Sequence, residues 1–138
     1  MKLKQIVISI ENSPGRLCEV TEALGKAGIN LRALNLVDTG AFGQLRLLVS
    51  DVATARSILM KMQIPAFVNE VVAAEIPDKP GSLAAVLRPL RDADIQVIFM
   101  YAFIGFSSDK AVDVLQQNDI RLLDANAFGI LESNSKSG

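Results

Sequence analysis

Few residues of this chain could carry out catalysis or bind a metal ion. The sequence contains no histidine and a single cysteine, Cys18. Histidine is the commonest general base and the commonest metal ligand, so its absence removes both roles. One thiol is not enough to build a zinc or iron–sulfur site. We therefore expect no catalytic residue, no bound metal and no cofactor, and we interpret Cys18 as a small buried hydrophobic residue.

Two short polar motifs are stronger candidates for chemistry. Residues 12–17 read Asn-Ser-Pro-Gly-Arg-Leu, and residues 78–83 read Asp-Lys-Pro-Gly-Ser-Leu. Asparagine, serine and aspartate are typical helix caps, and proline is common in the first helical turn. The N–H groups and dipole at the start of a helix also suit a carboxylate. Asn12 or Ser13 is therefore expected to cap a helix.

The two motifs belong to an internal repeat that covers most of the chain. Gly15 and Gly81 are 66 residues apart, and other residues of similar type match at the same offset. The matching pairs are Leu17 with Leu83, Val20 with Val86, Leu24 with Leu90, Ile29 with Ile95, and Asn30 with Gln96. The chain is therefore expected to contain two copies of one structural unit.

The first copy has the pattern strand, helix, strand, strand, helix, strand. This order is typical of a ferredoxin-like βαββαβ module, an α+β fold with an antiparallel sheet and its helices on one face. Apolar residues alternate along residues 6–10, and further strands are expected at residues 30–38 and 44–50. Gly28 is expected to end the first helix, and Asp51 to cap the second. The residues expected to face the core from the first helix are Leu17, Val20, Leu24 and Ala27.

The second copy lacks a segment that the first copy has. Its residues 106–109 lead directly into residues 110–117, which have the pattern of the second helix. About ten residues that would form the third strand are missing, by comparison with the first copy. Either this module has lost a strand, or the sequence omits a loop at this point. We expect module 1 at residues 1–70, module 2 at 71–131, and a loose C-terminal tail at 132–138.

Composition argues against several classes of function. Half of the residues are hydrophobic, 21% are charged, and the formal net charge is −1. A nucleic-acid partner would require a basic surface, which this balance does not supply. No apolar run reaches the roughly 18 residues of a membrane span, and the N-terminal residues lack a signal-peptide pattern. We expect a cytoplasmic protein with neither a nucleic-acid nor a membrane partner.

The pattern of strand, Asn/Asp-x-Pro-Gly-x-Leu, helix, Gly-Ile-Asn and strand resembles the ACT domain. The first copy combines residues 12–17 with Gly-Ile-Asn at residues 28–30, and the second combines residues 78–83 with Asp-Ile-Gln at 94–96. The resemblance covers roughly residues 3–128 and is strongest to free-standing tandem ACT proteins. It implies a non-catalytic sensor that binds an amino acid between paired domains and regulates an enzyme of amino-acid metabolism.

The resemblance also implies which residues bind the ligand. ACT domains use the turn before the first helix and the start of the second strand. Carried over to this sequence, the ligand-binding residues are Asn12, Gly15, Leu17 and Asn30 in module 1, and Asp78, Gly81, Leu83 and Gln96 in module 2.

The two asparagines of module 1 have side chains that suit an amino acid. The amides of Asn12 and Asn30 can accept from an ammonium group and donate to a carboxylate. Module 1 is therefore predicted to hold a small polar amino acid between its Pro-Gly turn and its second strand. Module 2, with Asp78 and Gln96, is predicted to form a weaker or differently selective site. Unpaired strand edges predict a homodimer. The alternative is a structural or interaction protein that binds no ligand.

Overall fold

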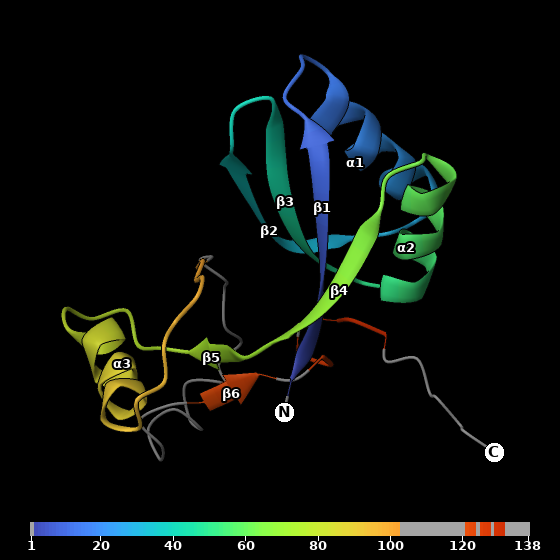
Figure 1. Ribbon diagram of the computed structural model, residues 1–138. Coiled ribbons are helices and arrows are strands. Elements are labelled where there is room, and N and C mark those ends of the chain that lie inside the picture. The colour runs from blue at the N-terminus through green and yellow to red at the C-terminus, as the bar shows by residue number, and fades with distance from the viewer. Residues whose placement is uncertain (1, 103–120, 124, 128, 132–138) are drawn as a thin grey trace. The chain divides into compact units, whose positions relative to one another are not determined.

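The computed structural model describes residues 2–102, 121–123, 125–127 and 129–131 (Figure 1). The chain divides into two compact units after residue 72 and again after residue 123, and the described residues from 125 onward belong to the first unit. The module limits expected from the sequence, 1–70 and 71–131, stay predictions. The helix expected at residues 110–117 and the tail at 132–138 lie outside the described residues.

The first unit is a four-stranded antiparallel sheet with two helices on one face. Figure 1 shows both helices on the same side of the sheet. The strands lie in the order β2-β3-β1-β4, so β2 and β4 are the edges. The ferredoxin-like α+β class predicted from the sequence is therefore confirmed. In chain order the elements are β1 (Leu3–Glu11), α1 (Arg16–Lys26), β2 (Leu31–Asp38), β3 (Phe42–Val49), α2 (Val52–Lys61) and β4 (Ala66–Val71).

Alternating side chains of the central strands build the core. Ile6, Ile8 and Ile10 of β1 point toward the helices and are almost fully buried, as are Leu45 and Leu47 of β3. The helices contribute residues four positions apart, which lie on one helix face. These residues are Val20 and Leu24 of α1, and Ala55 and Leu59 of α2. Burial of each large aliphatic side chain stabilises the fold by about 1.5–3 kcal/mol.

Two residues expected in this core lie outside it. Ala27 is exposed because it is the C-cap of α1, beyond the last turn that faces the sheet. Leu17 is 37% exposed because the first turn of α1 borders a hollow rather than the packed core. Gly28 ends the helix as predicted, with a left-handed φ of +75°.

Glycine backbones, rather than polar side chains, begin both Pro-Gly helices. Gly15 is the N-cap of α1 with a φ of +88°, and Gly81 is the N-cap of α3 (Ser82–Asp92) with a φ of +86°. Neither cap has a side-chain hydrogen bond, so the prediction that Asn12 or Ser13 caps α1 is wrong. The left-handed glycine closes a tight turn, in which the Arg16 N–H donates to the Ser13 carbonyl at 3.2 Å.

The same turn recurs 66 residues later. The Ser82 N–H donates to the Lys79 carbonyl, also at 3.2 Å. The ends of the two helices match as well, since the N–H of Ile29 donates to Leu24 and that of Ile95 donates to Leu90. The sequence repeat is therefore a repeat of backbone structure.

The described part of the second unit contains the first helix of the module and its first and last strands. Strand β5 (Ala73–Glu75) begins two residues after the end of β4 and pairs antiparallel with β6 (Arg121–Leu123), as β1 pairs with β4. Residues 97–102, which match the start of β2 in the repeat, form no strand. In the first unit β3 lies between β1 and β2. In a complete module, residues 97–102 would therefore pair with the equivalent of β3, and the loss of that strand from module 2 stays a prediction.

The residues after β6 pack on the first unit rather than continue the second. We call residues 125–127 and 129–131 the C-terminal turn. Ala125 and Ile130 of this turn are buried, and Leu131 forms a parallel bridge with Asp51. The turn therefore covers part of the first unit near the start of α2.

Asp51 caps α2 as predicted and gives a pH-dependent contribution to stability. Its carboxylate accepts from the Thr54 hydroxyl at 2.7 Å and from the Thr54 N–H at 3.1 Å. These two hydrogen bonds hold the pKa of Asp51 below its ordinary value. Because the pKa is lowered on folding, the contribution is present above the pKa of the unfolded chain and is lost as the pH falls through the folded pKa.

We expect Asp51→Ala to lower the free energy of unfolding by about 1 kcal/mol near neutral pH. The difference from the parent should shrink as the pH falls below about 4. Urea unfolding near neutral pH and in acid tests this. Asp51→Asn is the control, because its amide oxygen can still accept from Thr54 but does not titrate. A difference between parent and Asp51→Ala that stays constant in acid would contradict the assignment.

Candidate functional site

Two neighbouring hollows border the first turn of α1. The larger has a volume of about 480 Å³ and lies between α1, β2 and β3. The smaller has a volume of about 190 Å³ and lies at the turn between β1 and α1. Leu17 lines both. The larger is also lined by Gly15, Cys18, Thr21, Leu34, Leu45 and Leu47, and the smaller by Ile10, Glu11, Asn12, Ser13, Leu36, Asp38 and Gly43.

Asn12 and Asp38 form the polar wall of the smaller hollow. Nδ2 of Asn12 donates to Oδ1 of Asp38 at 3.2 Å and to the Gly40 carbonyl at 3.3 Å. The Gly40 N–H donates to the same Asp38 oxygen at 2.8 Å. Among the residues that the structure describes, Asp38 has no ion-pair partner. Its carboxylate is therefore able to attract an ammonium group at the edge of an otherwise apolar hollow.

Sequence reasoning did not find Asp38. The residue is the last of the strand expected at residues 30–38 and lies 26 residues from Asn12 along the chain. The β2–β3 hairpin places it opposite Gly43, while Gly43 pairs with Ile10 of β1, just before Asn12. Only this strand pairing brings the carboxylate to the Pro-Gly turn.

Asn30 lies at the other end of β2. Its N–H donates to Oγ of Ser50 at 2.9 Å, and its carbonyl accepts from the Ser50 N–H at 2.9 Å. Strand β2 has eight residues, so about 25 Å separates this end from Asp38. A single amino acid cannot touch both ends of the strand. The structure therefore does not bring Asn12 and Asn30 of one module to one ligand, contrary to the prediction.

The predicted ligand-binding residues of module 2 lie in a turn, a helix and a segment without strand structure. Asp78, Gly81 and Leu83 all belong to the turn and first residues of α3, and Gly81 and Leu83 are exposed. Gln96 lies in a stretch without strand structure. The described part of this module therefore offers the turn before the helix but no second strand beside it. The role of all eight predicted residues in binding stays a prediction.

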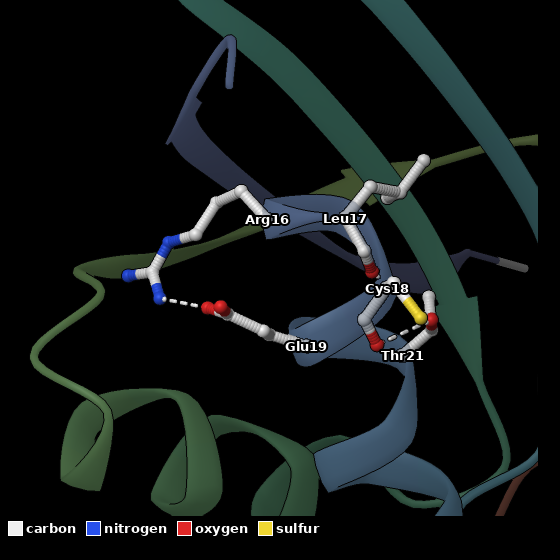
Figure 2. A network of polar contacts seen from close by, with 5 residues as sticks. All are labelled: Arg16, Leu17, Cys18, Glu19 and Thr21. Carbon is white, nitrogen blue, oxygen red and sulfur yellow. Dashed lines mark hydrogen bonds and ion pairs between the residues drawn. The ribbon is translucent and has the colours of Figure 1, made fainter. Parts of the chain in front are cut away.

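Polar groups at the start of α1 are satisfied within the helix, as Figure 2 shows. Arg16 pairs with Glu19 at 2.9 Å, and the Thr21 hydroxyl donates to the carbonyls of Leu17 and Cys18, both at 3.0 Å. Cys18 is exposed and lines the larger hollow, so the expectation that it is buried is wrong. Cys18 lies on a face of α1 that borders the hollow rather than the packed core.

Within the described ranges, no three potential ligands of the His, Cys, Asp and Glu types gather as a metal site. In the same part of the chain, no helix has the length and apolar character needed to cross a membrane.

Comparisons with known proteins cover most of the chain. A family model described as "ACT domain pair" matches residues 1–126. The crystal structure of protein BT0572 from Bacteroides thetaiotaomicron is similar with a TM-score of 0.79 and 35% identity, over 95% of this chain and 98% of that chain. The ligand-free regulatory subunit of aspartate kinase from Thermus thermophilus shares the fold, with a TM-score of 0.55 and 18% identity, over 72% of this chain and 76% of that chain. Comparison with curated proteins gives no match.

Gly15 and Gly25 provide a matched test of the turn that shapes the site. Neither has an atom within 4 Å of an added Cβ, so only the backbone conformation differs. We expect Gly15→Ala to destabilise the protein by about 1–2 kcal/mol, because its φ is left-handed. Gly25→Ala should stabilise it by about 0.5–1 kcal/mol, because Gly25 lies inside α1. Urea unfolding of both variants checks the signs, and equal effects would contradict the assigned turn.

Proposed function

Since the chain belongs to the family of ACT domain pairs, we propose that it is a non-catalytic regulatory protein that binds a free amino acid. Domains of this family are typically regulatory and bind small molecules. The proposed regulated partner is an enzyme of amino-acid metabolism, and the proposed location is the cytoplasm. The absence of histidine from the sequence supports a binding role rather than acid–base catalysis.

The proposal for the site rests on the positions of Asn12 and Asn30 at opposite ends of β2. Asn12 is bonded to Asp38 at the end of this strand, and Asn30 directly precedes its start. Strand β2 is an edge strand, and edge strands have unpaired backbone groups that can pair with another chain. If two copies pair their β2 strands antiparallel about a two-fold axis, the start of one β2 lies beside the end of the other. Asn30 of each copy then approaches Asn12 and Asp38 of its partner. One homodimer therefore contains two equivalent sites.

Exposed apolar side chains on β2 support this pairing. Leu34 and Leu36 are 52% and 45% exposed. They line the two hollows together with Leu17. A second copy beside β2 would cover these side chains and convert the open hollows into enclosed sites. Burial of apolar surface and new strand pairing would both stabilise the dimer.

The groups around the smaller hollow complement the two charges of an amino acid. Asp38 would accept from the ammonium group, helped by the side-chain carbonyl oxygen of Asn12. The amide of Asn30 from the partner copy and the first-turn N–H groups of α1 would donate to the carboxylate. The volume of about 190 Å³ and the leucine walls favour a small side chain.

Mixing two variants with weakened binding tests a site shared between copies. We expect Asn12→Ala and Asn30→Ala each to weaken amino-acid binding about tenfold, the factor for an unmet hydrogen bond to a charged group. A mixed dimer should regain one intact site, built from Asn12 of one chain and Asn30 of the other. After subunit exchange of equal amounts, about a quarter of the sites should bind with parental affinity. Calorimetry against the amino acid that most raises the melting temperature of the parent measures this.

Gln63→Ala is a matched control for loss of an amide side chain, since Gln63 lies at the end of α2, away from both hollows. A mixture that binds no better than either variant alone would contradict a shared site. Sedimentation should give a dimer at tens of micromolar, and a monomer there would exclude the β2 pairing.

The second candidate function is a structural or interaction protein that binds no ligand. The incomplete second module favours it, because α3 buries none of its residues and residues 97–102 form no strand. Under this alternative, none of the twenty amino acids would raise the melting temperature. Under the amino-acid-binding proposal, the weaker or differently selective site involves Asp78 and Gln96, and the stronger site is in module 1.

A further inference from the structure

The C-terminal turn is attached to the first unit at the end of β2 that holds Asn30. The Leu131 N–H donates to the Ser50 carbonyl at 2.6 Å. Nη2 of Arg32 donates to the Gly129 carbonyl at 3.1 Å. Ala125 and Ile130 are 5% and 6% exposed, so the turn is packed as well as hydrogen-bonded. The turn is thus hydrogen-bonded at two points, to Arg32 in β2 and to Ser50 just after β3.

Ser50 connects the C-terminal turn with Asn30. Its hydroxyl oxygen accepts from the Asn30 N–H, and its own N–H donates to the Asn30 carbonyl. Its carbonyl accepts from Leu131. Both backbone groups of Asn30 are therefore bound to a residue that is itself bound to the turn. We propose that the C-terminal turn fixes the backbone of Asn30 and makes Ser50, Arg32 and Leu131 positioning residues for its side chain.

The contact between Arg32 and the C-terminal turn leaves no room for a side chain at Gly129. A Cβ at this position would lie 2.8 Å from Nη2 of Arg32, and the φ of Gly129 is +61°. The guanidinium therefore packs directly on the glycine backbone. Arg32 is two residues from Asn30, so this contact restrains the same stretch of the chain.

The arrangement links the two modules through the chain itself. Strand β6 belongs to the second unit, and the C-terminal turn comes directly after it along the sequence. Release of the turn would act through Ser50 on the backbone of Asn30. The effect on ligand affinity rests on the proposed function, whereas the effect on the Asn30 backbone does not.

Leu131→Pro and Leu131→Ala form a matched pair in the full-length protein. Proline lacks the N–H that bonds Ser50, whereas alanine keeps it. The Leu131 side chain is 70% exposed, so its truncation alone should change little. Hydrogen exchange without ligand should be about fivefold faster at the Asn30 and Ser50 amides of Leu131→Pro, the factor for one lost hydrogen bond. Leu131→Ala should exchange like the parent, and unchanged rates in Leu131→Pro would overturn the proposal.

Exchange at the α2 amides shows whether Leu131→Pro remains folded. If it does not, Arg32→Met replaces it, because this change removes the bond to Gly129 and should also speed exchange at Asn30. Where the parent binds an amino acid, Leu131→Pro should weaken binding about fivefold. Faster exchange with unchanged affinity would overturn the positioning role. If the parent binds none of the twenty, the proposed function fails, while the exchange rates still decide whether the turn fixes Asn30.

Discussion

The pairing of β1 with both β3 and β4 is the constraint on which the first unit depends. Because β1 lies in the middle of the sheet, its isoleucines at positions 6, 8 and 10 face both helices and complete the core. The same order leaves β2 at an edge. The residues proposed to bind a ligand therefore lie at the two ends of an edge strand, where a second copy of the chain can reach them.

The described part of the second unit is less complete than the first unit. Its first and last strands, β5 and β6, pair directly with each other. Residues 97–102, which match the start of β2 in the repeat, form no strand. The two copies of the repeat therefore offer unequal frameworks. This inequality supports the proposal that the first module holds the ligand site.

Much of the fold could be predicted from local sequence. Alternation along residues 6–10 fixed the buried face of β1, and the Asp51 cap and the Gly28 stop depend on neighbouring backbone groups. The exposure of Leu17 and Cys18 could not be predicted, since helical spacing does not show where the sheet beneath a helix ends. Asp38 was missed for a related reason, because its approach to Asn12 depends on strand pairing.

By itself, the sequence determined the repeat and the order of elements in module 1, and it predicted a shorter module 2. These features depend on periodicity, glycine positions and segment length, which are local properties of the chain. Only the tertiary structure placed Asn12 beside Asp38, and Asn30 about 25 Å away beside Ser50. It also brought Leu131 to Ser50, a contact between residues distant in sequence. The physical reason is that sheet register and the packing of the C-terminal turn depend on contacts that no local pattern encodes.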